Sequence, residues 1–384
     1  MAHSKQVNIH RENPPLWFRE ADFGIFIHWG IYSVPAFAPV ETESFDVILR
    51  EKPQEYLFKN QPYAEWYKNS MAIADSPAQK HHREHYGDMP YEGFATTFRD
   101  TSKNADPEEW ADYFHNAGAR YVVLVTKHHD GFVMFNSRQP NPNIADYMLD
   151  FDFTGRLAQA CRSRGMRFGV YYSSLLDWTF TDKPILTAGD LLLGNDNSKR
   201  YKDYCYNHWL EIIERYKPDV LWGDIGYPAD KRLPDLFATY YNAVPEGMAN
   251  DRWGQMPGFL RNRPGRGLVN ALAKAALKRP PDKTKVMAAK YYDFRTLEYD
   301  YAWRGGEDVW FEVCRGMDKS FAYNRYSRPE DYISAEEVMK IIEAVRPDKG
   351  RLLLNVGPDE NGTIPEYQKA VLTQLAGYRS GSRG

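Results

Sequence analysis

Short apolar runs recur along the chain, separated by longer segments in which apolar positions follow a helical period. The runs fall at residues 23–27, 121–125, 168–172, 220–222, 286–289 and 352–356, with a further strand end near residues 248–252. Polar residues do not alternate with apolar ones inside these runs, which is typical of strands buried on both faces of a parallel sheet. The pattern therefore predicts a parallel sheet whose strands are spread over most of the chain.

Helical periodicity fills the gaps between the predicted strands. It is seen at residues 155–164, 202–216, 233–241, 335–345 and 365–378, and a short amphipathic helix is predicted at 268–279. Another helix should precede the strand at residue 121, because Asp106 can cap free backbone N–H groups and Pro107 sits where no donor is needed. Glu109 is expected to complete a capping box with Asp106, and Gly118 to end this helix.

Strand and helix alternate for so long that a (β/α)8-like TIM barrel is favoured over a doubly wound sheet. No GxGxxG or GxxxxGK[ST] segment is present, which weakens a nucleotide-binding alternative. We predict an α/β protein with an N-terminal arm at 1–14 and one catalytic barrel domain at 15–384. A basic insertion at about 255–285 interrupts this domain, since eight Lys and Arg residues stand there against Asp282 alone.

Composition adds three constraints to this picture. The 384 residues carry 49 basic and 52 acidic side chains, so a net charge of −3 argues against a protein that coats nucleic acid. Cys161, Cys205 and Cys314 are far apart and predict neither a zinc site nor a disulfide framework. The aromatic share of 15% suits a core, and it also suits a surface on which sugar rings stack.

The N-terminus lacks the apolar stretch of a secretory signal, and no apolar run reaches the roughly 18 residues of a membrane span. The chain as given is expected to be soluble, either cytoplasmic or exported with its signal removed. For the basic insertion, two interpretations stay open. It is a solvated surface segment, or it forms a rim that attracts an anionic substrate or a partner surface.

In a parallel barrel the active site lies at the carboxyl ends of the strands, so the polar residues after each apolar run are the candidates for chemistry. These residues are His28, His128, His129, Asp177, Asp224, Arg252 and Glu298, and several have aromatic neighbours. Carboxylates combined with aromatic faces are what glycoside cleavage requires, because two carboxyl groups carry the reaction and the rings hold the sugar.

A metal site is the competing interpretation of His128 and His129. Metal ligands on one strand usually alternate, because neighbouring side chains of a strand point to opposite faces. Adjacent histidines fit a metal only if they lie in a loop. We therefore expect them to bind substrate hydroxyl groups, with a structural hydrogen-bonding role as the alternative.

Several motifs resemble the α-L-fucosidases of glycoside hydrolase family 29. They are WFREADFGIFIHWG at 17–30, PYAEWY at 62–67, TKHHDGF at 126–132, FGVYYS at 168–173, LDW at 176–178, LWGDIGYP at 221–228, NDRWG at 250–254, DFRTLEY at 293–299, SFAYN at 320–324 and LLLNVGP at 352–358. The resemblance covers about residues 15–378 in order. It implies a somewhat distorted (β/α) barrel and a retaining mechanism that needs no metal and no cofactor.

Carried over residue by residue, the resemblance implies two catalytic residues and a set that binds the sugar. Asp224 matches the nucleophile, and Glu298 matches the acid/base, with Asp300, Glu307 and Asp177 as its rivals. The positions that match the fucose pocket are His28, Glu65, Trp66, His128, His129, Tyr171, Trp222, Arg252 and Phe321. Arg252 is expected to lower the pKa of Asp224 or Glu65, or to bind a sugar hydroxyl group.

Many family members carry a C-terminal β-sandwich, and we expect this chain to lack it, because about 28 residues follow the LLLNVGP motif. The expected function is exo-acting hydrolysis of terminal α-L-fucosyl linkages through a covalent fucosyl-enzyme. The expected partner is a fucosylated oligosaccharide or glycoconjugate, with neither nucleic acid nor membrane, and self-association as a homo-oligomer is left open. The alternatives are a catalytically inactive, lectin-like fucose-binding relative and a metal-dependent barrel hydrolase.

Overall fold

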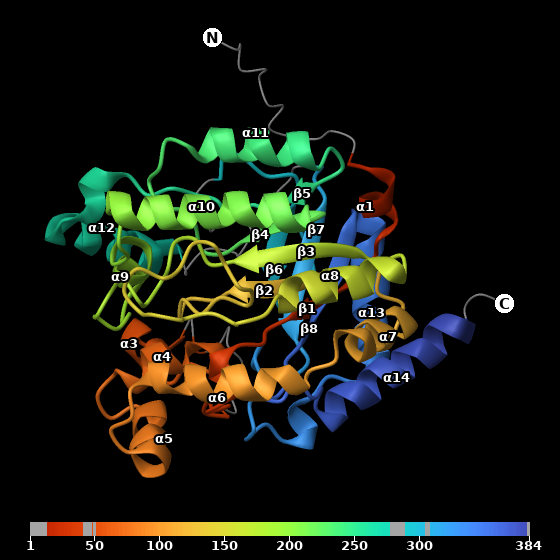
Figure 1. Cartoon of the computed structure of the whole chain (residues 1–384), viewed down its shortest axis with the longest axis horizontal. Helices are drawn as coiled ribbons and strands as arrows, with labels where there is room; N and C mark the ends of the chain where they lie inside the picture. The colour runs from red at the N-terminus through yellow and green to blue at the C-terminus, as the bar shows by residue number, and fades with distance from the viewer. Residues whose placement is uncertain (1–13, 41–47, 49–50, 277–288, 304–307, 382–384) are drawn as a thin grey trace, which may run out of the picture.

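The fold is built on one sheet of parallel strands that curls into a distorted barrel (Figure 1). This computed structural model describes residues 14–40, 48, 51–276, 289–303 and 308–381. The strands are β1 Phe23–Ile27, β2 Tyr121–Lys127, β3 Arg167–Tyr172, β4 Val220–Gly223, β5 Met248–Ala249, β6 Arg295–Glu298, β7 Phe311–Gly316 and β8 Gly350–Val356. Their order is β5-β4-β3-β2-β1-β8-β7-β6, which confirms the predicted barrel class.

Helices surround the strands, with α10 and α11 along one side and α6, α7 and α14 along the other (Figure 1). The helices are α1 Leu16–Glu20, α3 Gln54–Lys59, α4 Tyr67–Met71, α5 Pro77–Tyr86, α6 Phe94–Thr101, α7 Pro107–Asn116, α8 Phe153–Ser163, α9 Ala188–Leu193, α10 Lys199–Tyr216, α11 Leu233–Ala243, α12 Arg263–Ala276, α13 Ala335–Val345 and α14 Glu366–Gly381. In the described part of the chain, none of them is both long and apolar enough to cross a lipid bilayer.

Most strands and helices lie where the sequence pattern placed them. Strand β1 and helix α13 have the predicted bounds, and β2, β3, β4 and β8 extend one or two residues beyond theirs. Asp106 caps α7, but its Oδ1 accepts the backbone N–H of Glu108 at 2.9 Å rather than that of Glu109. The predicted capping box is thus replaced by a simple N-cap.

Two strands, β6 and β7, were not predicted. The apolar run at 286–289, proposed as a strand, lies almost entirely outside the described residues, and β6 follows it at Arg295–Glu298. Strand β7 was missed because it contains Glu312 and Arg315, which break the apolar pattern. Glu312 is fully buried, yet it is compensated by hydrogen bonds from the hydroxyl group of Tyr121 at 2.6 Å and from Nε1 of Trp222 at 2.8 Å.

The barrel is joined differently between β5 and β6. In the residues described, no strand ladder links this pair, and Asp293 connects them instead. Its backbone N–H donates to the carbonyl oxygen of Ala249 at 2.7 Å, while its Oδ2 accepts the N–H of Ala249 at 2.8 Å and the hydroxyl group of Tyr241 at 2.7 Å. Asp251, which lies just after β5, also accepts the backbone N–H of Thr296 in β6 at 3.0 Å. Two aspartates therefore replace the missing ladder and bring the end of β6 beside the end of β5.

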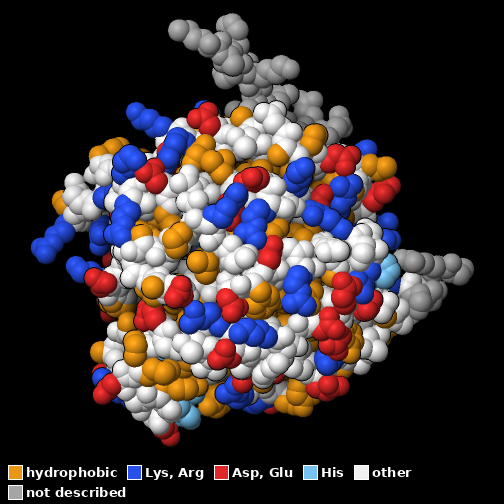
Figure 2. Space-filling view, in the orientation of Figure 1, with side chains coloured by type: hydrophobic (Ala, Val, Ile, Leu, Met, Phe, Trp, Pro, Cys, Tyr) orange, Lys and Arg blue, Asp and Glu red, His pale blue; other side chains and the backbone are white. Residues whose placement is uncertain are grey.

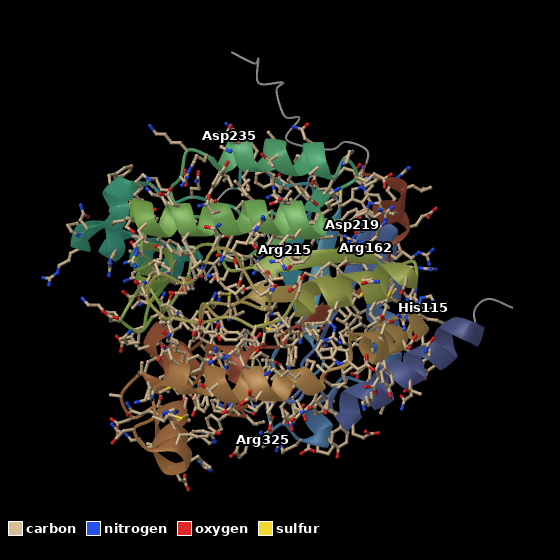
Figure 3. The ribbon with its side chains drawn as sticks, viewed as in Figure 1. His115, Arg162, Arg215, Asp219, Asp235 and Arg325 are labelled. Carbon is tan, nitrogen blue, oxygen red and sulfur yellow. The ribbon has the colours of Figure 1, made fainter. Side chains whose placement is uncertain are left out.

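The barrel strands have an outer and an inner face. Ile25 and Ile27 of β1 pack with the surrounding helices, whereas Phe26 between them points to the interior cluster that contains Tyr171 and Trp222. The outer layer is also tied by polar contacts, since Arg162 of α8 donates to the carbonyl oxygen of Tyr216 at 2.7 Å (Figure 3). The interior cluster ends at the carboxyl side of the strands, where the site lies.

Candidate active site

A cavity of about 320 Å³ opens at the carboxyl ends of the barrel strands. Every residue predicted for the site lines it, namely His28, Glu65, Trp66, His128, His129, Tyr171, Trp222, Asp224, Arg252, Glu298 and Phe321. The parallel sheet explains the gathering, because strand ends that are far apart in sequence meet at one edge. The structure therefore brings the whole predicted set together.

Arg252 connects the two predicted catalytic carboxylates. Its Nη1 atom lies 2.6 Å from Oε1 of Glu298 and 3.0 Å from Oδ1 of Asp224. Because both distances are measured to the same nitrogen, the two oxygens are separated by at most their sum. This upper limit, set by one oxygen of each carboxyl group, agrees with the close carboxyl pair of retaining glycosidases, in which the groups lie roughly 5–5.5 Å apart.

The surroundings of Asp224 keep it ionised. Burial acts to raise the pKa of Asp224, but the charge of Arg252, the proximity of His129 and a hydrogen bond from Tyr171 outweigh it, so the pKa lies below its ordinary value. The hydroxyl group of Tyr171 donates to Oδ2 of Asp224 at 2.8 Å. Asp224 is thus a buried carboxylate that is held by fixed donors and is charged at neutral pH.

The backbone turns sharply after each of the two carboxylates. Ile225, which follows Asp224, has a φ of 61°, and Tyr299, which follows Glu298, has a φ of 52°. Left-handed backbone is rare for residues other than glycine and is costly for a β-branched one such as Ile225. Such strain collects at functional sites, where the surrounding packing holds a side chain in a required direction.

Glu65 is a second buried carboxyl group at the cavity wall. It lies on a short 3-10 helix, Ala64–Trp66, and its Oε2 accepts the backbone N–H of Ala322 at 2.9 Å. Burial raises the pKa of Glu65 to about 8, which places a proton on it at neutral pH. A protonated Glu65 can both donate and accept a hydrogen bond, as a sugar hydroxyl group requires.

The raised pKa of Glu65 predicts a pH effect on stability. Between the ordinary pKa of 4.5 and about 8, the folded chain holds a proton that the unfolded chain has lost, so Glu65 lowers stability increasingly as the pH rises. Glu65→Gln cannot ionise, and its melting temperature relative to wild type should increase between about pH 5 and about pH 8. Thermal unfolding followed by circular dichroism checks this, and a difference that stays constant across that range would contradict it.

The histidines of the cavity are neutral. Burial lowers the pKa of His28 and of His129 to about 4, and it lowers the pKa of His128 well below its ordinary value. Nδ1 of His28 lies 2.6 Å from Oδ1 of Asn355, and Nδ1 of His129 lies 2.7 Å from Oγ of Ser173. These contacts fix the imidazole rings, and each neutral ring offers one donor and one acceptor.

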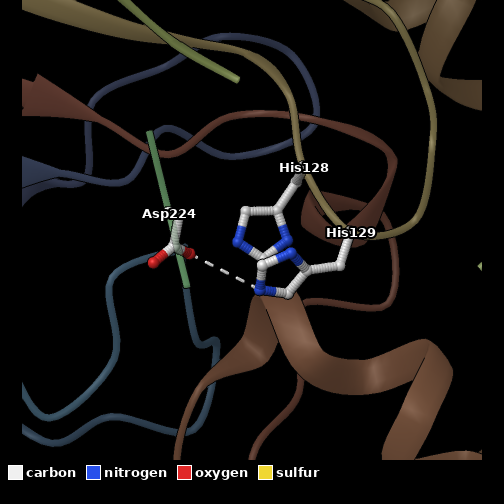
Figure 4. A group of neighbouring side chains, drawn as sticks. All are labelled: His128, His129 and Asp224. Carbon is white, nitrogen blue, oxygen red and sulfur yellow. Dashed lines mark ion pairs between the residues drawn. The ribbon is translucent and has the colours of Figure 1, made fainter. Parts of the chain in front are cut away.

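His128 and His129 both face the cavity because they follow the end of β2 in a turn. Their rings lie 4.0 Å apart between centroids, and Nε2 of His129 is 3.6 Å from Oδ2 of Asp224 (Figure 4). Ligand atoms of His128, His129 and Asp224 all fall within 4.8 Å of one another, a spacing that a metal ion could use. However, both oxygens of Asp224 already accept hydrogen bonds, and the adjacent Arg252 cation would repel a metal ion. The arrangement favours hydrogen bonding over metal ligation.

Aromatic rings form much of the inner wall. The rings of Tyr171 and Trp222 stack at 5.4 Å with an interplanar angle of 28°, and the guanidinium group of Arg252 lies 5.1 Å from the centroid of Trp222. The indole N–H of Trp222 donates a hydrogen bond to Oε1 of Glu312, which holds the ring in place. Sequence patterns missed Glu312 because a charged residue inside a buried strand gives no apolar signal.

Among the acidic residues considered for the acid/base role and described in the structure, Glu298 lines the cavity, whereas Asp177 and Asp300 do not. Asp177 does not line the cavity and forms a fully buried ion pair with Lys127 at 2.9 Å. Asp300 lies outside the cavity lining, and Glu307 lies outside the described residues.

Sequence patterns also missed Gln61, which lines the cavity and is 4% exposed. Its Oε1 atom has no hydrogen-bond partner in the described part of the chain. An acceptor of this kind suits a sugar hydroxyl group.

Comparisons with known proteins indicate one family. The family described as Alpha-L-fucosidase matches residues 2–380. The chain is 30% identical to the tissue alpha-L-fucosidase of Homo sapiens over 93% of its own length and 66% of that protein, and 28% identical to the alpha-L-fucosidase of Dictyostelium discoideum over 95% and 70%. It thus spans about two thirds of the length of these relatives.

A solved structure gives the same result. The Thermotoga maritima alpha-fucosidase in complex with a mechanism-based inhibitor is 40% identical, with a TM-score of 0.76 over 95% of this chain and 73% of that one. The family match, the related sequences and the barrel confirm the predicted resemblance. This chain belongs to the α-L-fucosidase family of glycoside hydrolases.

Proposed function

We propose that this chain is an exo-acting, retaining α-L-fucosidase in which Asp224 is the nucleophile and Glu298 the acid/base. The observation that carries this proposal is the placement of both carboxylates on one guanidinium nitrogen of Arg252. That placement keeps the two carboxyl groups close together, as is required when one carboxylate attacks the sugar while the other serves the leaving group.

In the first step, protonated Glu298 gives its proton to the glycosidic oxygen as the bond from this oxygen to C1 breaks. Asp224 attacks C1 from the opposite face, so that its carboxylate oxygen forms the new bond of a fucosyl-enzyme. In the second step, Glu298 takes a proton from water, the water oxygen bonds to C1, and Asp224 leaves as a carboxylate. Two inversions at C1 return the starting configuration. The low pKa of Asp224 favours its role in both steps.

The remaining wall suits a deoxy sugar at the blind end of the cavity. The neutral rings of His28, His128 and His129 and protonated Glu65 supply donors and acceptors to the hydroxyl groups. Trp66 and Phe321 are both largely buried and offer apolar faces to the ring and the C6 methyl group. The proposed substrate is a fucosylated oligosaccharide or glycoconjugate with a terminal α-L-fucosyl group.

The configuration of the first product tests the proposal. With an aryl α-L-fucoside, proton NMR should detect α-L-fucose before the β-anomer appears by mutarotation. Initial release of β-L-fucose would contradict the retaining mechanism, and fucose binding without turnover would favour the lectin-like alternative. A chelator added in excess serves as a control for metal dependence, and the rate is expected to be unchanged.

A further inference from the structure

The catalytic cavity also has an apolar part that contains none of the residues predicted to bind the sugar. It is formed by Leu57 and Phe58 of α3, Leu191 and Leu192 of α9, Ala273 of α12 and Ile225, which follows the predicted nucleophile. The polar residues of the cavity come mostly from strand ends, whereas this wall comes mostly from helices at the carboxyl side of the strands (Figure 1). A second moiety of the substrate, with different chemistry from the sugar, would contact it.

The apolar wall is fixed in place by polar contacts behind it. The backbone N–H of Gly189 on α9 donates to Oδ1 of Asn270 on α12 at 2.6 Å, and the N–H of Ala188 donates to Oε1 of Gln54 on α3 at 3.1 Å. A Cβ atom at position 189 would lie 2.9 Å from the carbonyl oxygen of Arg266, so glycine permits the close approach of the two helices. The three helices therefore form one built surface.

The wall is continuous with the reaction centre. Ile225 packs with the aromatic cluster of the cavity and also with the cluster of Leu192 and Val269, which joins α9 to α12. An exo-acting enzyme holds the terminal sugar at the blind end of its cavity, so the leaving group must extend toward the mouth. In a barrel the active site opens at the carboxyl ends of the strands, and α3, α9 and α12 lie on that side of the sheet (Figure 1).

The outer surface of α12 has a different character from its cavity side. Leu268 and Leu272 are 52% and 60% exposed, and Lys and Arg side chains project from the same edge of the molecule (Figure 2). Val269 and Ala273, by contrast, are buried toward α9 and the cavity. This contrast supplies a matched control, because Leu268 lies on the same helix but outside the cavity.

We propose that α3, α9 and α12 form the subsite for the leaving group, and that this subsite selects fucosides whose leaving group is an apolar ring or chain over those with a hydrophilic one. The inference rests on the proposed fucosidase function and adds the class of leaving group to it. Its physical basis is that apolar groups gain free energy on leaving water, whereas hydroxyl groups placed against an aliphatic wall lose hydrogen bonds.

Three substrates with the same fucosyl group test the subsite: methyl, cyclohexyl and inositol α-L-fucosides. Cyclohexanol and inositol have the same ring, and methanol and cyclohexanol are alcohols of similar acidity, so chemical reactivity does not favour cyclohexyl. Wild type should turn over the cyclohexyl fucoside with a kcat/KM at least about tenfold above that of the methyl and inositol fucosides. Leu191→Gln should reduce this preference by about threefold or more, while Leu268→Gln should leave it unchanged.

The outcomes are distinguishable. Ala273→Ser repeats the test in case Leu191→Gln does not fold, as judged by its melting temperature. Turnover of the methyl fucoside without a preference for cyclohexyl, or a preference unaffected by both wall variants, overturns the subsite and leaves the proposed function standing. If an aryl α-L-fucoside is turned over but none of the three is, the subsite fails and the proposed function stands. If the aryl fucoside is not turned over either, the proposed function fails, and the subsite fails with it.

Discussion

Asp224→Gly is expected to lose turnover of an aryl α-L-fucoside by roughly 10⁴-fold or more, because it removes the carboxylate that is proposed to form the covalent intermediate. Tyr171 and Arg252, which donate hydrogen bonds to Asp224, remain in the variant and can donate to a small anion bound in its place. Added azide should therefore restore turnover. It attacks C1 directly from the face that Asp224 occupied, so one inversion gives β-L-fucosyl azide.

Two control variants test the interpretation of the result for Asp224→Gly. Asp224→Asn keeps the shape of the side chain and should be similarly slow, which separates loss of the nucleophile from loss of packing. Asp235→Asn, an exposed position on α11, should retain the wild-type rate. A near-normal rate for Asp224→Asn, or α-L-fucosyl azide as the rescue product of Asp224→Gly, would show that the nucleophile lies elsewhere.

Glu298→Ala should show a loss that depends on the leaving group. An acidic phenol leaves without a proton, so its release should be slowed little, whereas an alkyl fucoside should lose roughly 10²–10⁴-fold in kcat/KM. With the phenolic substrate the fucosyl-enzyme should accumulate, because the water that hydrolyses it lacks a base. Azide needs no base and should attack this intermediate, giving α-L-fucosyl azide with retention.

The opposite configurations of the two azide products assign the roles of Asp224 and Glu298 independently of rate. Asp300→Ala is the matched control, since Asp300 lies two residues after Glu298 but does not line the cavity. It should behave as wild type with both kinds of substrate. An equal loss for phenolic and alkyl fucosides in Glu298→Ala, or a leaving-group-dependent loss in Asp300→Ala, would move the acid/base role away from Glu298.

The sequence was sufficient to propose Asp224 and Glu298 as the catalytic residues, but it did not predict that both would contact Arg252. Asp224 and Glu298 are recognisable because each lies at a strand end in a distinctive motif, Asp224 just after β4 and Glu298 as the last residue of β6, and the positions at strand ends are restricted by the barrel. The sequence left three roles open for Arg252. Its place between the two carboxylates depends on the ends of β5 and β6 meeting, and the side chains of Asp293 and Asp251 rather than a strand ladder bring them together.

The amino-acid sequence by itself determined the barrel class and most of its strands, because apolar runs and capping residues act over short distances along the chain. The strand-end pattern proposed some of the residues at the cavity, and the resemblance to the fucosidase family supplied the others. Only the tertiary structure decided features that join distant segments. Strand β7 is stable because Tyr121 and Trp222 compensate buried Glu312, and His128 and His129 face one cavity because β2 ends just before them. The apolar wall of α9 and α12 likewise exists only where the two helices pack, since neither segment carries a recognisable motif.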